Sequence, residues 1–134
     1  MPLIRWSSRL SVGIDQFDNE HQKMVEMIND LHQALKTGRG SASIGTILDG
    51  LICYTSTHFA SEEILMQKHT FPGLEKHKAE HSALTKQVLE FQKEYHNDKA
   101  VPQSLMLFIK DWLMKHILDE DREYGPYLNS MGVK

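Results

Sequence analysis

Apolar residues recur every three or four positions along four long segments of this chain, the spacing of helices packed against one another. In one segment the seam runs through Leu74, His77, His81, Leu84, Val88, Phe91 and Tyr95. Two positions that should carry leucine or isoleucine carry imidazole instead. Each buried imidazole needs a partner, because an unpaired buried polar group costs about 1–3 kcal/mol.

The other three segments have the same helical period, and none shows the sustained alternation of a strand. The first runs through 17–35 and ends at the glycines of 38–40, and the second runs through 44–65 with Ser41 or Ser43 as its N-cap. We expect Pro72 near the first turn of the third helix, and a fourth helix from Pro102 to near 125–126. Four amphipathic helices with short polar connections predict an all-α, up-down-up-down four-helix bundle.

The length favours one domain over residues 1–134, with the bundle at about 15–128 and the irregular residues 1–14 as an N-terminal arm across it. A net charge of -3 gives no electrostatic case for nucleic acid or an anionic membrane surface as a partner. The sequence contains no signal-peptide pattern and no apolar run of roughly 18 residues. With Cys53 as the single cysteine, these features predict a cytoplasmic protein with no membrane insertion.

Every one of the four seams carries at least one side chain that can bind a metal: His21, His58, Glu62, His77, His81 and His116. A single buried histidine is ordinarily a hydrogen-bonded core residue. Six such groups in one narrow core would each need a partner, and a bound metal satisfies them together. The pairs at 58/62 and 77/81 place their donors on one helix face, about 5–6 Å apart at Cβ. We therefore expect a metal centre inside the bundle.

The remaining histidines are predicted not to bind metal. His32 lies one step off the first seam and His96 lies at a helix end, so both are expected at the surface. His69 keeps the seam phase but lies beside the break before the third helix, near the end of the bundle.

On the fourth helix, spacing leaves two acidic candidates. Glu120, at i+4, is the natural partner of His116, because Asp121, at i+5, points about 140° away on a regular helix.

Four motifs occur in order, one on each predicted helix: D-x-x-H at 18–21, H-x-x-x-E at 58–62, H-x-x-x-H at 77–81 and H-x-x-x-x-D at 116–121. Together with the opening WSSRLSVGIDQFDNEH, this ordered set resembles the hemerythrin family, in particular its short single-domain bacteriohemerythrins, over nearly the whole chain. The resemblance implies a non-haem di-iron centre that binds O2 reversibly.

The resemblance also implies which residues hold which iron. His77, His81 and His116 would bind one iron ion, and His21 and His58 the other. Glu62 and Asp121 would bridge the two, together with an oxo or hydroxo group, so the resemblance selects Asp121 over Glu120.

Seven side chains exceed the needs of one tetrahedral zinc, which by itself indicates two metals. Two octahedral metals offer about twelve positions, and this donor set leaves one free, on the metal with two histidines. Four apolar residues resemble the family's pocket around O2, although such residues at helical spacing are usually plain core: Phe59, Trp112, Leu113 and Ile117. Tyr124, one turn after Asp121, is a candidate hydrogen-bond donor behind the ligands.

The first functional hypothesis is reversible O2 binding for storage, delivery or sensing, with O2 as the ligand and an unidentified protein as its acceptor. The alternatives are a di-iron enzyme acting on peroxide or nitric oxide, and an iron-handling or structural protein. The sequence contains no E-x-x-H motif of the kind that di-iron carboxylate proteins use, which favours binding over catalysis. The free coordination position favours O2 binding over a structural role.

Overall fold

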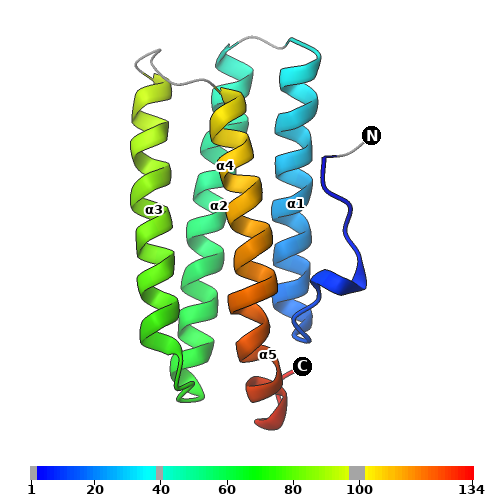
Figure 1. Ribbon diagram of the computed structural model, residues 1–134, viewed down its shortest axis with the longest axis vertical. Coiled ribbons are helices and arrows are strands. Elements are labelled where there is room, and N and C mark those ends of the chain that lie inside the picture. Colours follow the sequence, from blue (N-terminus) through cyan, green and yellow to red (C-terminus); the bar gives the residue numbers. More distant parts are fainter. Residues whose placement is uncertain (1–2, 39–40, 97–101) are drawn as a thin grey trace.

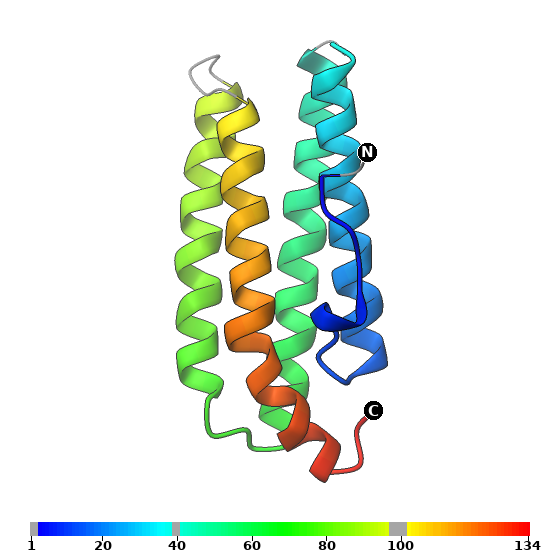
Figure 2. The ribbon, with the colours of Figure 1, turned by 45° about the vertical axis from the view of Figure 1, so that its right-hand side comes forward.

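The computed structural model describes residues 3–38, 41–96 and 102–134, and in it four long helices lie side by side (Figure 1). They are α1 at Asp15–Lys36, α2 at Ser41–Lys68, α3 at Leu74–His96 and α4 at Pro102–Lys115. Consecutive helices run in opposite directions, and α4 returns beside α1 (Figures 1 and 2). The predicted up-down-up-down bundle is confirmed, with no strand in the described ranges.

The seams of the four helices meet in a common core. Its fully buried apolar side chains include Phe17, Met24, Ile28, Leu31, Leu48, Leu51, Met66, Ile117 and Leu128. Burying one large apolar side chain contributes about 1.5–3 kcal/mol, so the spacing of these residues determines how the helices pack. The seam side chains of Phe91, Tyr95 and Leu105 lie outside the described residues.

The C-terminal segment departs from the single helix that its spacing predicts. After α4 comes a six-residue π-helical turn, η2, at His116–Asp121, and then α5 at Arg122–Ser130. The expected end near 125–126 is wrong, because α5 continues through Pro126 and buries Leu128 fully, which outweighs the lost N–H donor and the ring clash that proline brings to a helix. Figure 2 shows α5 turning away from the axis of α4, as π-turns and prolines commonly cause.

One helix start differs from expectation and one agrees with it. α2 already begins at Ser41, so Ser41 is its first residue, Ser43 lies inside the helix, and neither precedes it as an N-cap. α3 begins at Leu74, so Pro72 lies near its first turn as expected, in the preceding turn, where the Leu74 N–H donates to the Phe71 carbonyl at 3.2 Å. In the part of the chain that the structure describes, no helix is both long and apolar enough to cross a membrane.

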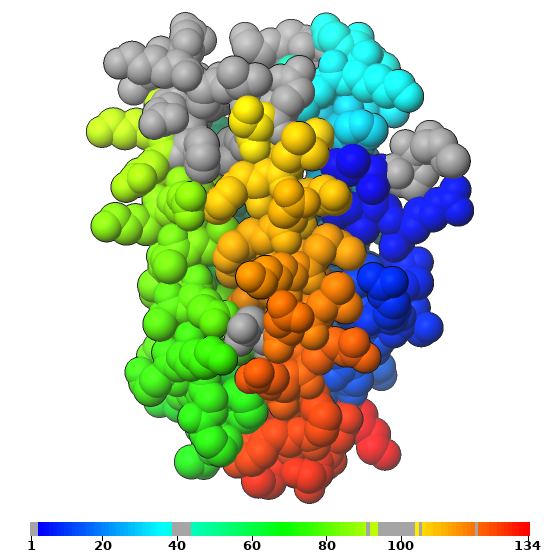
Figure 3. Space-filling view, viewed as in Figure 1, coloured from blue at the N-terminus to red at the C-terminus, as the bar shows by residue number. Residues whose placement is uncertain are grey.

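The N-terminal arm lies along α1 as irregular chain with one 3-10 turn at Ser8–Leu10 (Figure 1). The amide of Asn29 donates to the Ile4 carbonyl and accepts from the Ile4 N–H, both at 2.9 Å. Asp18 accepts a hydrogen bond from the Val12 N–H at 2.8 Å. In Figure 3 the side chains of the arm and of α4 share one face of the molecule.

The arm also approaches α5 closely at Gly125. A Cβ at this position would lie 2.0 Å from the Val12 carbonyl oxygen, so only glycine permits the contact.

We predict that Gly125→Ala destabilises the fold by about 1–3 kcal/mol, because the added methyl group must push the arm away from α5. Gly50→Ala is the matched control: its Cβ would meet only Met27 Cε at 3.6 Å, an ordinary contact. Alanine's higher helix propensity makes the control neutral or stabilising by up to about 1 kcal/mol. Urea unfolding followed by circular dichroism measures both, and equal stabilities would contradict the prediction.

Candidate metal centre

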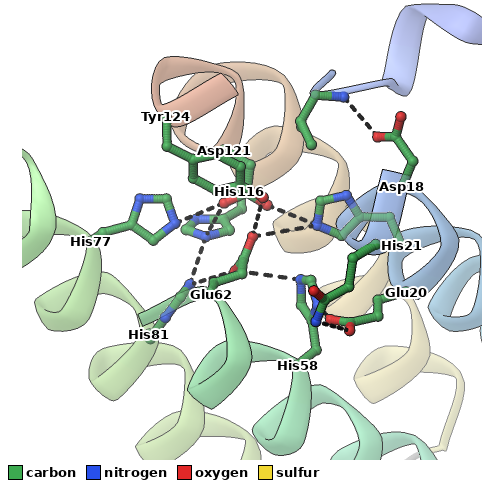
Figure 4. Close-up of polar contacts among 12 residues, drawn as sticks. Asp18, Glu20, His21, His58, Glu62, His77, His81, His116, Asp121 and Tyr124 are labelled. Atoms are coloured by element: carbon green, nitrogen blue, oxygen red, sulfur yellow. Dashed lines mark hydrogen bonds and ion pairs between the residues drawn. The ribbon is translucent and has the colours of Figure 1, made fainter. Parts of the chain in front are cut away.

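Seven polar side chains from α1, α2, α3 and η2 converge in the core of the bundle (Figure 4). These are the predicted residues His21, His58, Glu62, His77, His81, His116 and Asp121. Each is at most 3% exposed, and the two carboxylates, Glu62 and Asp121, are 0% exposed. Packing of the helices along their seams thus brings together side chains that are up to 100 residues apart in the chain.

The π-helical turn η2 explains how Asp121 reaches the cluster. In a π-helix hydrogen bonds link residue i to i+5, so residues five apart are separated by about one turn and share a face. His116 Nε2 and Asp121 Oδ1 lie 3.0 Å apart. The side chain of Glu120, the candidate that regular helical spacing favoured, lies outside the described residues.

The donor atoms form two groups that share both carboxylates. One group contains His77, His81 and His116, the other contains His21 and His58, and the atoms of each lie within 4.8 Å of one another. Asp121 directs one oxygen to each group: Oδ1 is 2.8 Å from His77 Nε2, and Oδ2 is 3.1 Å from His21 Nε2. Glu62 Oε1 likewise lies 3.3 Å from both His81 Nε2 and His58 Nε2.

Hydrogen bonds within the protein satisfy only some of the polar atoms of this cluster. Among the described residues, four buried atoms directed at it lack a hydrogen bond: His21 Nε2, His58 Nε2, Glu62 Oε1 and Asp121 Oδ2. Each unsatisfied group costs about 1–3 kcal/mol. His81 Nε2 and His116 Nε2 also lie only 3.1 Å apart, although both carry lone pairs when the rings donate from Nδ1. Cations between these atoms would satisfy them, and imidazole with carboxylate suits iron. The residues present therefore fit a two-metal centre.

The histidines and carboxylates of the cluster shift one another's pKa values. Burial opposes the charged form of His58, but the carboxylates of Glu62 and Glu20 outweigh it and raise the pKa of His58 to about 10. Against the same effect of burial, Asp121 and Glu62 raise the pKa of His21. The pKa values of Glu62 and Asp121 are lowered despite burial, because the histidines around them stabilise the carboxylates. Protons therefore occupy the cluster when metal does not.

Aromatic rings pack directly on two of the cluster histidines. Phe59 stacks on His81 with ring centroids 3.8 Å apart, and the half-buried Trp112 stacks on His116 at 4.2 Å. Leu113 and Ile117 are buried at 2% and 0% exposure. Phe59, Leu113 and Ile117 are therefore core residues and Trp112 packs against the core, while their service as an O2 pocket stays a prediction.

Tyr124 lies behind Glu62. Its hydroxyl donates a hydrogen bond to Glu62 Oε2, and its ring is fully buried against Phe17 and His77. Burial and the charge of Glu62 raise the pKa of Tyr124, so the phenol keeps its proton and remains a donor.

Of the other histidines, His32 and His69, whose side chains the structure describes, are absent from both donor groups. His69 is half-buried, and its carbonyl accepts a hydrogen bond from the Tyr127 hydroxyl at 2.7 Å. His32 is half-buried rather than fully exposed, because one step off the seam still leaves it at the edge of the helix interface. The side chain of His96 lies outside the described residues.

Sequence reasoning missed three glutamates that contact the outer ring nitrogens of cluster histidines. These pairs are Glu20 with His58, Glu63 with His81, and Glu80 with His116. The signal was available, since each glutamate is the sequence neighbour of a cluster residue. Asp18 of the D-x-x-H motif is not a member of the cluster and instead holds the arm.

Comparison with known proteins agrees with this geometry. The family model described as Hemerythrin HHE cation binding domain matches residues 12–128. The chain belongs to the hemerythrin family. The bacteriohemerythrin of Methylococcus capsulatus is 38% identical over 132 residues, covering 97% of this chain and 100% of that protein. The bacteriohemerythrin of Stenotrophomonas maltophilia is 34% identical over 125 residues, covering 93% and 81%.

Solved hemerythrin structures have the same fold. A wild-type hemerythrin crystal structure superposes with a TM-score of 0.88 at 37% identity, covering 92% of this chain and 96% of that one. A single-site hemerythrin variant superposes with a TM-score of 0.89, covering 94% and 97%. The hemerythrin family implies a di-iron centre, and the histidine and carboxylate cluster could hold its metal.

We predict that Asp121→Ala loses most of its bound iron on gel filtration, because both donor groups lose a shared carboxylate. Asp119→Ala, at an exposed position in the same turn, should keep the wild-type iron content. Iron per chain is measured by a colorimetric assay, and equal retention by the two variants would show that Asp121 is not a ligand.

Metal uptake should also depend on pH. Because the pKa values of His21 and His58 are raised, protons bound near neutral pH must leave before metal enters. The apparent affinity of the metal-free protein for Co(II) should therefore rise from pH 6 to pH 8, by about tenfold per unit for each proton displaced. Competition with a chromophoric chelator measures this affinity, and a value independent of pH would contradict the prediction.

Proposed function

We propose that this protein binds O2 reversibly at a non-haem di-iron centre, for storage, delivery or sensing. The observation that carries the proposal is the pair of donor groups, which share two carboxylates but contain unequal numbers of histidines. Membership of the hemerythrin family supports iron as the metal. The whole chain, arm included, would form one hemerythrin-like domain.

In this proposal His77, His81 and His116 bind one iron ion, and His21 and His58 bind the other. Glu62 and Asp121 would bridge them together with an oxo or hydroxo group. The observation that each oxygen of Asp121 faces a different donor group supports the bridging role. Two octahedral ions would offer about twelve positions, and this donor set would leave one of them free, on the side of His21 and His58.

When bound, the two ferrous ions supply the electrons that hold O2. The protein side chains orient the ligands, support them by hydrogen bonds and exclude water. The imidazoles orient their Nε2 atoms toward the cluster, and Tyr124 holds Glu62 in place through its hydroxyl proton. Phe59, Trp112, Leu113 and Ile117 form the proposed apolar wall, which excludes water and so protects a reversible site from side reactions.

A binding role fits the enclosure of the cluster better than catalysis on a larger substrate. All seven side chains are at most 3% exposed, so a large substrate could not contact the donor atoms directly. Peroxide and nitric oxide are as small as O2, so the choice between binding and catalysis rests on the missing E-x-x-H motif, and on that ground we propose an O2-binding protein and not an enzyme. Cytoplasmic localisation and a protein acceptor of O2 stay predictions.

The test is to measure visible spectra while the reduced, iron-loaded protein is cycled between argon and air. We expect a charge-transfer band that appears under air and disappears under argon over many cycles. Zn(II)-loaded protein is the control and should show no band, because zinc has no redox chemistry. Irreversible oxidation in the first cycle would contradict O2 carriage.

A further inference from the structure

Three half-buried glutamates contact the cluster histidines from outside the cluster. Glu20 Oε1 lies 2.5 Å from His58 Nδ1. Figure 4 shows the two side chains facing each other. Glu63 Oε2 lies 2.9 Å from His81 Nδ1, also at hydrogen-bond distance. Glu80 Oε2 lies 3.5 Å from His116 Nδ1, a longer ion-pair contact. Their side chains are 19%, 26% and 31% exposed, so bulk water only partly screens these contacts. We call these three contacts the glutamate braces.

The glutamate braces follow a regular pattern around the bundle. Glu20 of α1 contacts α2, Glu63 of α2 contacts α3, and Glu80 of α3 contacts η2, which continues α4. Each glutamate directly adjoins a cluster residue of its own helix. Neighbouring residues on an α-helix differ by about 100°, so a residue beside an inward-facing ligand faces the adjacent helix. Every brace therefore crosses from one helix to a histidine of the next.

A histidine offers the Nε2 lone pair to a metal only when its other nitrogen carries the proton. A carboxylate at Nδ1 accepts that proton's hydrogen bond, fixes the ring orientation and makes Nε2 a stronger donor. The Nε2 atoms of all three braced rings point into the cluster: those of His81 and His116 lie 3.1 Å apart, and that of His58 lies 3.3 Å from Glu62.

We propose that Glu20, Glu63 and Glu80 are positioning residues that fix the tautomer and orientation of His58, His81 and His116 and thereby set how tightly the centre holds its metals. The inference rests on the proposed function, because it takes these histidines to be metal ligands.

Within the described ranges, two of the five cluster histidines have no glutamate brace, His21 and His77. Among the described residues, both ring nitrogens of His21 are buried without a hydrogen bond. In the donor group with two histidines, Glu20 therefore provides the only brace that the described residues contain, and it is the shortest of the three contacts. Removing the charge of Glu20 should consequently have the largest effect, and removing that of Glu80 the smallest.

The test uses single substitutions in the Co(II)-loaded full chain: Glu20→Gln, Glu63→Gln and Glu80→Gln. Glu26→Gln on α1 and Glu90→Gln on α3 are matched controls at exposed positions. The measured quantity is the rate of Co(II) release to excess chelator. Loss of an outer partner of a metal-bound histidine typically costs about 10–100-fold, so Glu20→Gln should release Co(II) at least tenfold faster, with the controls within about twofold of wild type.

A spectroscopic readout separates positioning from general loosening of the fold. In the Co(II) protein, the Nδ1 proton of each ligand histidine gives a strongly shifted proton NMR signal that exchanges with solvent. Each brace variant should accelerate the exchange of one such signal and leave the others unchanged. Acceleration of all signals together, with a lower melting temperature of the metal-free protein, would mean a structural role and overturn the inference.

The outcomes also separate this inference from the proposed function. Wild-type protein that binds two Co(II) ions, with brace variants that release them at the rate of the controls, overturns the positioning role alone. Wild-type protein that binds no metal overturns the proposed function, and the inference with it. Faster release that follows the order Glu20, Glu63, Glu80 supports both.

Discussion

Two fully buried carboxylates, Glu62 and Asp121, are the constraint on which the rest of the structure depends. A carboxylate cannot remain charged in a dry core without positive charge beside it. Five imidazoles surround the pair, and their inward-facing nitrogens are too close to one another, and too poorly hydrogen-bonded, to satisfy the core without protons or metal ions. The polar cluster in the core of this bundle therefore requires bound cations, and the apolar seams enclose it.

The bundle meets this constraint by distributing the donors over all its helices. No helix supplies more than two cluster residues, so the centre forms only when all four helices are packed. Metal binding and folding are consequently coupled, since the unfolded chain has no preformed site. The arm, held by Asp18 and Asn29, covers the outside of α1 and meets α5 at Gly125. The apolar parts of the fold thus keep the polar cluster enclosed.

Much of this structure could be predicted from the sequence, because helical spacing is a strong signal over long segments. The seam positions of His21, His58, His77 and His81 indicated both the bundle and the metal centre. The π-helical turn could not be predicted, because spacing arguments assume about 3.6 residues per turn. Only the family resemblance selected Asp121. The wider π-helical turn explains physically why Asp121 shares a face with His116.

Other features were missed because seam patterns describe only the inward face of each helix. Glu20, Glu63 and Glu80 lie beside the seam, where a solvated glutamate and a brace look alike in sequence. The predicted helix end at 125–126 is wrong because a proline ordinarily ends a helix, whereas here burial of Leu128 keeps the chain helical beyond Pro126. Local rules of this kind fail where tertiary packing outweighs them.

The central claim is that seven side chains hold two iron ions in unequal environments. Mössbauer spectroscopy of protein enriched in ⁵⁷Fe and reconstituted to saturation, with iron per chain measured on the same sample, tests it most directly. Two iron ions per chain, with two resolved iron environments in the O2-exposed protein, are the predicted result. One iron ion per chain, or none retained after gel filtration, would contradict the claim.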